Sequence, residues 1–257
     1  MANAPSAELV VVPCLADNYA FLVHNDATGE TALIDAPEEG PIREALRKRG
    51  WTLSDILITH HHHDHIGAVD ALRPGARVIG AKADAHRLPP LDLQVAEGDT
   101  ITVSGQTTHV IDVSGHTIGH VAFHMPDAGY AFTADSLMAL GCGRLFEGNA
   151  AQMWQSLKKL RALPEDTQIC SGHEYTAANA RFALSVDADN PKLISRIEGI
   201  TQARADGQPT IPSTLREEML TNPFLRADDP AFKGVLGMAD ASDEDVFAHV
   251  RAAKDKF

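Results

Sequence analysis

The chain has 257 residues, of which 44% are hydrophobic, so it can bury the core of one large domain or of one domain with a smaller neighbour. A formal net charge of −13 argues against a nucleic-acid-binding protein and against attraction to an anionic membrane. No apolar stretch reaches the roughly 20 residues that span a bilayer, and residues 1–13 lack the pattern of a secretory signal, so we expect a cytoplasmic protein.

The first part of the sequence predicts β-strands around one helix. Apolar runs predict strands at residues 9–12, 20–24, 31–35 and 55–58, and a helix at residues 42–48 that ends at Gly50.

The fourth strand runs into a block of metal-binding side chains, His60-His61-His62-His63-Asp64-His65. Alternate side chains of an extended segment share a face, so His60 and His62 can bind one metal while His61 and His63 point elsewhere. The apolar residues that follow predict a helix start, where Asp64 and His65 can project together toward a second metal. Imidazole and carboxylate ligands suit zinc, iron or manganese, and the absence of thiolates argues against a structural cysteine-type zinc site.

A histidine run can also be a purification tag or a metal-buffering tract. Tags lie at chain ends, and buffering tracts lie in polar, repetitive sequence. This run is internal, between an apolar strand and an apolar helix. A metal site is therefore the better interpretation.

The middle of the chain predicts further strands, at residues 77–80, 100–103, 108–113, 120–125 and 130–133. A helix follows whose apolar stripe is predicted to be core: Met153, Trp154, Leu157 and Leu160. The three cysteines, Cys14, Cys142 and Cys170, are odd in number and far apart, so we expect small packed residues rather than disulfides.

Three more potential metal ligands follow apolar strands. His116 comes after the strand that ends at Val113, Asp135 comes after residues 130–134, and His173 comes after residues 168–172. Each residue alone would be an ordinary loop residue. A sheet layered with helices can gather such strand ends along one edge, so together with the histidine block they predict one site.

From Glu174 onward the pattern changes to helices without strands, at residues 176–185, 191–205, 213–220 and 242–254. We expect a catalytic domain at residues 1–173 and a helical domain at residues 174–257. In the last helix, Ser242 is the expected N-cap. Arg251 and Lys254 lie three residues apart and share a face, which by itself would indicate a solvated basic surface.

Several of these motifs resemble those of a known family. The histidine block, Gly115-His116-Thr117, Asp135 and Gly172-His173-Glu174-Tyr175 resemble the metallo-β-lactamase superfamily. Within it, four segments look like the glyoxalase II (hydroxyacylglutathione hydrolase) family: Asp17-Asn18-Tyr19, the stretch from Gly141 to Gly148, Asn222-Pro223-Phe224-Leu225-Arg226, and the stretch from Arg251 to Asp255.

The resemblance implies an α/β fold, a four-layer αββα sandwich with a C-terminal helical domain. It implies that His60, His62 and His116 hold one divalent metal, that Asp64, His65 and His173 hold a second, and that Asp135 bridges both. It also implies that the substrate, a glutathione thioester, is bound by Arg144, Phe146, Tyr175, Arg251 and Lys254. Phe146 departs from members that carry tyrosine there, and it lacks the corresponding hydroxyl.

The chemistry of such a site suits thioester hydrolysis. Two divalent ions, zinc or else iron or manganese, can lower the pKa of a bridging water to near 7 and polarise the carbonyl. Asp64 can orient the resulting hydroxide. A thiol has a pKa of about 8.5, so the departing sulfur needs no strong general acid. We predict a monomer that hydrolyses S-D-lactoylglutathione to glutathione and D-lactate, the second step of methylglyoxal detoxification.

Other functions remain open from the sequence. A different hydrolase on the same fold, such as a lactonase, or a persulfide dioxygenase with a single iron, could keep the histidine block. A non-catalytic metal-binding module is an alternative from another class of protein. The cationic C-terminal helix and the stretch from Gly141 to Gly148 favour the glutathione thioester.

Overall fold

A computed structural model describes residues 7–257, and these form two compact units. Unit 1 contains the chain up to Asp112 together with Ile118–Ala134. Unit 2 contains Val113–Thr117 and Asp135–Phe257. Each unit is described by itself below. Among the described residues, no helix combines the length and the apolar character needed to cross a bilayer.

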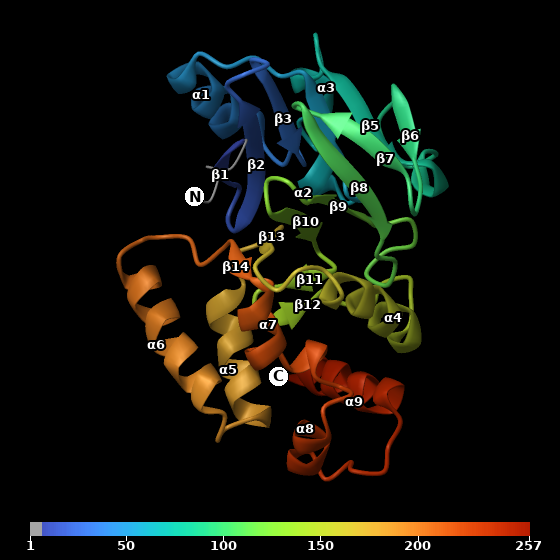
Figure 1. Cartoon of the computed structure of the whole chain (residues 1–257), viewed down its shortest axis with the longest axis vertical. Helices are drawn as coiled ribbons and strands as arrows, with labels where there is room; N and C mark the ends of the chain where they lie inside the picture. Colours follow the sequence, from blue (N-terminus) through green and yellow to red (C-terminus); the bar gives the residue numbers. More distant parts are fainter. Residues whose placement is uncertain (1–6) are drawn as a thin grey trace. The chain divides into compact units, whose positions relative to one another are not determined.

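The first sheet of unit 1 is mixed and runs in the order β1-β2-β3-β4-β5-β6. The strands are β1 (Glu8–Cys14), β2 (Asn18–Asn25), β3 (Glu30–Ile34), β4 (Asp55–Leu57), β5 (Arg77–Ala81) and β6 (Leu93–Val95). β1, β2 and β3 are antiparallel, whereas β3 to β6 pair in parallel (Figure 1). Parallel neighbours end at the same edge, so the segments after β3 and β4 leave the sheet together.

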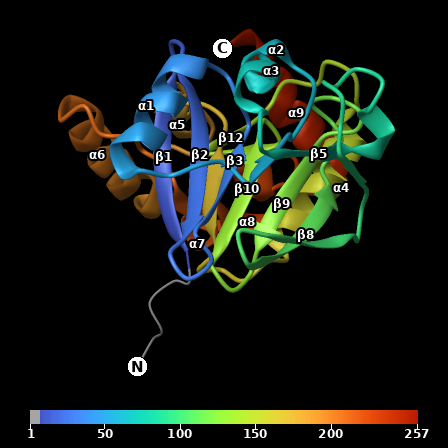
Figure 2. The same cartoon turned by 90° about the horizontal axis from the view of Figure 1, so that it is seen from above.

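The other strands of unit 1 are antiparallel neighbours in the order β10-β9-β8-β7. They are β7 (Thr100–Val103), β8 (Gln106–Asp112), β9 (Val121–Met125) and β10 (Tyr130–Ala134), and Figure 2 shows β8, β9 and β10 side by side. The rings of Phe21 on β2 and Phe132 on β10 lie 5.6 Å apart. The two sets of strands are therefore in contact through apolar side chains.

Helix α1 (Glu39–Arg49) covers a face of the first sheet. Its inward residues Ile42 and Leu46 are buried in one cluster with Leu22 and Leu33. Gly50 ends the helix with φ of 69°, as the sequence predicted. The expected helix after the histidine block is present as α2 (His63–Ile66) and α3 (Val69–Leu72), and η1 (Lys82–Asp84) follows β5.

Unit 2 is mainly helical. Its elements are β11 (Leu137–Met138), β12 (Gly141–Cys142), α4 (Ala150–Arg161), β13 (Gln168–Ser171), α5 (Thr176–Val186), α6 (Pro191–Ala205), β14 (Ser213–Thr214), α7 (Leu215–Thr221), η2 (Pro223–Leu225), α8 (Pro230–Val235) and α9 (Asp243–Lys256). Trp154 packs on Phe247, which in turn contacts Phe224. These aromatic contacts join α4, η2 and α9 into one core.

Several sequence predictions for these elements are confirmed. The stripe on α4 is buried, Ser242 caps α9, and all three cysteines are buried and free. The prediction of helices without strands after Glu174 is wrong, because β14 pairs antiparallel with β13. Thr214 also forms a capping box with Glu217, so the sequence around Ser213 resembles a helix start, and α7 begins only at Leu215. β6 and α8 were not predicted.

Candidate metal centre and substrate pocket

In unit 1, the carboxylate of Asp35 holds the histidine block. Asp35 follows β3 with φ of 56°. Its Oδ1 accepts a hydrogen bond from the Thr59 amide (2.9 Å), and its Oδ2 accepts bonds from the Thr59 hydroxyl (2.8 Å) and from His65 Nδ1 (2.8 Å). Backbone strain of this kind persists only where the surroundings enforce it. Here three hydrogen bonds do so.

These bonds fix the protonation pattern of two histidines. His65 donates from Nδ1 to Asp35, so the lone pair of its neutral imidazole is on Nε2. The Thr59 hydroxyl gives its hydrogen to Asp35, so it can only accept from His60 Nδ1, 3.1 Å away. Because Nδ1 of the neutral His60 imidazole carries the hydrogen, its Nε2 is the acceptor atom, and this atom lies 3.1 Å from His62 Nδ1. Carboxylate-backed imidazoles of this kind are typical of metal ligands.

The two neighbouring histidines are placed differently. His61 Nδ1 lies 2.9 Å from Oδ2 of the fully buried Asp84. His63 is exposed at the start of α2. His60 and His62, by contrast, face each other with ring centroids 4.8 Å apart. The alternation expected from the sequence is thus present in the structure.

Asp64 lies on α2, and the side chain of Asn18 holds it. Asn18 Nδ2 donates to both the carbonyl oxygen (3.1 Å) and the carboxylate Oδ2 (3.0 Å) of Asp64. Asn18 was not predicted to belong to the site. The only signal for it was the match of Asp17-Asn18-Tyr19 to the family.

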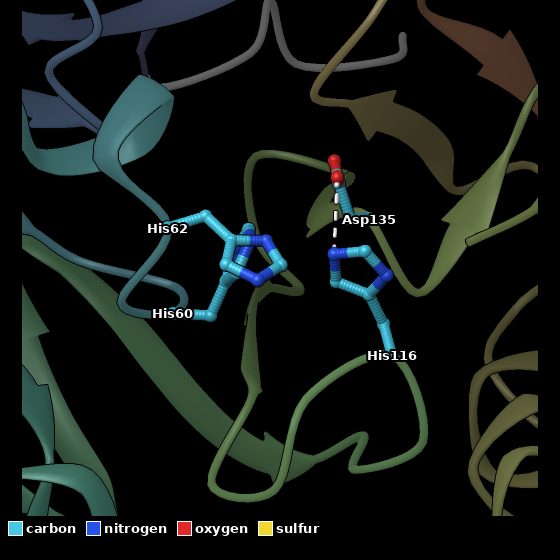
Figure 3. A group of neighbouring side chains, drawn as sticks. All are labelled: His60, His62, His116 and Asp135. Carbon is cyan, nitrogen blue, oxygen red and sulfur yellow. Dashed lines mark hydrogen bonds and ion pairs between the residues drawn. The ribbon is translucent and has the colours of Figure 1, made fainter. Parts of the chain in front are cut away.

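In unit 2, one carboxylate lies between two imidazoles. Asp135 Oδ2 is 3.4 Å from His116 Nε2, and its Oδ1 is 3.3 Å from His173 Nε2. Figure 3 shows the first of these ion pairs as a dashed line. His116 Nδ1 donates to the carbonyl of Arg144 (2.8 Å), which directs its Nε2 lone pair toward Asp135. The Asp135 carboxylate thus presents one oxygen to each of the two imidazoles.

Gly143 permits this arrangement by having no side chain. A Cβ at this position would lie 2.0 Å from the carbonyl oxygen of Asp135 and 2.9 Å from His116 Nδ1. Any other residue would therefore displace the backbone of Asp135 and the side chain of His116. In the sequence, the only signal for this glycine was its place in the family-like stretch from Gly141 to Gly148.

The described residues contain two groups of His and Asp side chains that could each hold a metal ion. The groups are His60, His62, His116 and Asp135, and Asp64, His65 and His173. Together they contain all seven predicted ligands. The ligands are imidazoles and carboxylates, without a thiolate, which fits a catalytic pair of divalent ions such as zinc, iron or manganese. The two groups are consistent with a binuclear metal site.

A pocket of about 390 Å³ lies beside His116 and Asp135 in unit 2. It is lined by all five predicted substrate-binding residues: Arg144, Phe146, Tyr175, Arg251 and Lys254. The ring of Phe146 lies 5.2 Å from that of His116, and the ring of Tyr175 stacks on His173 at 4.6 Å. The pocket is therefore lined by two candidate metal ligands, His116 and Asp135, and by three cationic side chains.

Two of these cations differ in environment. Arg251 is buried, donates from Nη1 to the carbonyl of Cys142 (2.9 Å) and pairs through Nη2 with Asp255 (2.9 Å). Lys254 is half-buried, and burial lowers the pKa of its ammonium group. The positive charges of Arg251, Arg181 and Arg144 lower this pKa further. An anion bound here would relieve the repulsion among these cations.

Comparison with known proteins first defines the class. The family model of the metallo-beta-lactamase superfamily matches residues 16–173. Among solved structures, ETHE1 from Myxococcus xanthus is similar with a TM-score of 0.67 and 24% identity, covering 96% of this chain and 89% of that one, a likeness that shows the fold alone. The chain thus has the metallo-β-lactamase fold with a C-terminal helical domain, as predicted, and it is a metal-binding hydrolase of this superfamily.

The particular family follows from the remaining matches. The model described as hydroxyacylglutathione hydrolase C-terminus matches residues 174–257. The chain is 62% identical to hydroxyacylglutathione hydrolases of Cereibacter sphaeroides and of a Jannaschia species, over 97% of this chain and 99% and 98% of the relatives. The chain belongs to the hydroxyacylglutathione hydrolase (glyoxalase II) family and has its activity.

Proposed function

We propose that the seven predicted ligands hold two ions. One ion is bound by His60, His62 and His116, the other by Asp64, His65 and His173, and Asp135 bridges them. The proposal is supported by the two oxygens of Asp135, which face different imidazoles. It is also supported by the hydrogen bonds of Nδ1, which place the lone pair of each neutral imidazole on Nε2 in His60, His65 and His116.

Zinc is the proposed native metal, with iron or manganese as alternatives, because all the ligands are nitrogen or oxygen atoms. Cys142 lines the pocket, but it belongs to neither group of candidate ligands, and burial raises the pKa of its thiol to about 11. When bound, the two ions would lower the pKa of a water molecule to near 7 and polarise the thioester carbonyl.

The chain's own residues orient the reaction. Asp64 would accept a hydrogen bond from the attacking water, and Asn18 fixes this carboxylate at 3.0 Å. The departing glutathione thiol has a pKa near 8.5, so it leaves as a thiolate without a general acid. Asp64 and Asp135 are therefore the proposed catalytic residues, one orienting water and the other spacing the ions.

The proposed substrate is S-D-lactoylglutathione. The observation that carries this proposal is the pocket, in which Arg144, Arg251 and Lys254 lie on the same cavity as His116 and Asp135. Glutathione has two carboxylates, and a protein of net charge −13 needs a local cationic site to bind them. Tyr175 and Phe146 would contact the peptide, and Phe146 would act through its ring alone.

We further propose that residues 1–173 act as the catalytic domain and residues 174–257 as the substrate-binding domain of a monomer. The two family matches meet between residues 173 and 174, which supports this division. Three buried free cysteines suit the reducing cytoplasm, where we propose that the protein acts.

The test is a substrate pair assayed with the metal-loaded protein. S-D-lactoylglutathione should release equal amounts of free thiol and D-lactate, at a kcat/KM far above that for a small lactoyl thioester without the glutathione peptide. Equal kcat/KM for both substrates would contradict the proposed glutathione pocket. Metal analysis of the same sample should find two ions per chain.

A further inference from the structure

The segment from Asn222 to Arg226 matches the family, yet it has no part in the site described above. Asn222 is fully buried at the end of α7. Its Nδ2 donates to the carbonyl oxygens of Met138 (3.1 Å) and Gly141 (3.0 Å), and to Glu218 Oε2 (3.0 Å). Met138 is on β11 and Gly141 is on β12, so Asn222 binds both strands of the β11–β12 hairpin.

Glu218, one turn earlier on α7, holds the tip of the same hairpin. Its buried Oε2 accepts a hydrogen bond from the amide of Leu140 (2.9 Å), a residue with φ of 55°. Its Oε1 accepts from the Ser213 hydroxyl (2.6 Å) and pairs with Arg196. A fixed carboxylate therefore stabilises a turn that is unfavourable for leucine.

The hairpin leads directly to the substrate pocket. Cys142, its last residue, accepts a hydrogen bond from Arg251 Nη1 through its carbonyl (2.9 Å). The Arg251 guanidinium also lies 5.0 Å from the ring centroid of Phe224. The amide of Phe224 donates to Asn222 Oδ1 (3.0 Å). One asparagine side chain thus binds the hairpin that ends at Cys142 and the backbone of Phe224, and both Cys142 and Phe224 contact the guanidinium.

We propose that Asn222, supported by Glu218, is a positioning residue for the glutathione thioester. It holds the Cys142 carbonyl and the Phe224 ring so that Arg251 lines the pocket in one orientation. The inference rests on the proposed substrate-binding role of Arg251. Asn222 neither lines the pocket nor belongs to a group of candidate metal ligands, so its effect should be on substrate affinity, through Arg251.

The test compares Asn222→Ala with a matched control, Asp187→Asn. Asp187 is also buried in unit 2 and pairs with Arg226, but it does not line the pocket. Asn222→Ala should raise KM for S-D-lactoylglutathione on the order of ten-fold, the equivalent of one lost hydrogen bond to a charged group. The kcat, the metal content and the KM for a small thioester should stay near the parent values. Asp187→Asn should lower Tm without changing KM.

A double-mutant cycle separates this inference from the function on which it rests. If Asn222 acts through Arg251, then Asn222→Ala should add little to the KM of Arg251→Ala. Additive effects, an equal loss with the small thioester, or the same KM change in Asp187→Asn would overturn the inference. If Arg251→Ala itself leaves KM unchanged, the proposed role of Arg251 in binding is wrong, and the inference fails with it.

A second variant covers the case in which Asn222→Ala does not fold. Phe224→Leu keeps the apolar character of the site and the backbone bond to Asn222, but it removes the ring beneath the guanidinium. It should raise KM for the glutathione thioester and leave KM for the small thioester near the parent value. An unchanged KM in this variant would overturn the inference as well.

Discussion

Lys254 allows the substrate pocket to be tested through its charge alone. Its ammonium group lies over the rings of Phe182 (5.2 Å) and Phe257 (5.4 Å), and its stem is half-buried. Lys254→Met keeps an unbranched apolar stem and removes the charge. A charge-assisted hydrogen bond to a substrate carboxylate contributes about 1.5–3 kcal/mol, so KM should rise about ten- to a hundred-fold.

The pH dependence of binding gives an independent signature. Burial and the neighbouring positive charges lower the pKa of Lys254. The substrate carboxylate needs the protonated ammonium, so affinity is full below this lowered pKa and is lost as pH rises through it. The loss should therefore begin below the usual lysine pKa of about 10.4. Lys254→Arg should remove this dependence, because a guanidinium stays charged throughout this pH range.

The measurement is the inhibition constant of an S-alkylglutathione that the enzyme cannot hydrolyse, taken from about pH 7 to pH 10. The parent and Lys254→Arg are compared at each pH, since titration of the ligand's own amine affects both equally. Parallel curves for the two proteins would refute the contact between Lys254 and a carboxylate. So would an unchanged inhibition constant in Lys254→Met at neutral pH.

Three further predictions concern the metal site. Asp135→Ala should lose metal together with activity, because the bridging carboxylate offsets the repulsion between two ions, and metal analysis that finds both ions retained would remove Asp135 from that role. His61→Asn and His63→Asn should each keep the parent metal content, since neither side chain belongs to the ligand groups, and loss of an ion from either variant would show that the assigned ligands are wrong. Gly143→Ala should reduce metal content and kcat together by at least ten-fold, because its Cβ would lie 2.0 Å from the Asp135 carbonyl; normal metal content in a folded variant would contradict this.

The sequence predicted much of the site because its ligands follow strands. The apolar runs before His60, His116, Asp135 and His173 indicated strand ends, and β4, β8, β10 and β13 end just before these residues. The alternation of side chains in an extended segment distinguished the candidate ligand His60 from His61. Both arguments use only local periodicity, which a single sequence contains.

The supporting residues could not be predicted because their contacts join distant parts of the chain. Asn18 meets Asp64 across 46 positions, and Asn222 meets Met138 across 84. Arg251 alone on a helix face would indicate a solvated cation. It is instead buried, with Nη1 bound to the Cys142 carbonyl and Nη2 paired with Asp255. The strand β14 was missed for the same reason, as it exists only through pairing with β13.

Asp35 supports a histidine ligand of each of the two proposed metal positions. It holds His65 directly and His60 through the Thr59 hydroxyl, and these histidines belong to different ligand groups. A substitution at Asp35 would loosen one ligand of each ion at the same time. A single mutation at Asp35 would therefore change the metal affinity of both positions together. Selection for a different metal at one position alone has to act on residues other than Asp35.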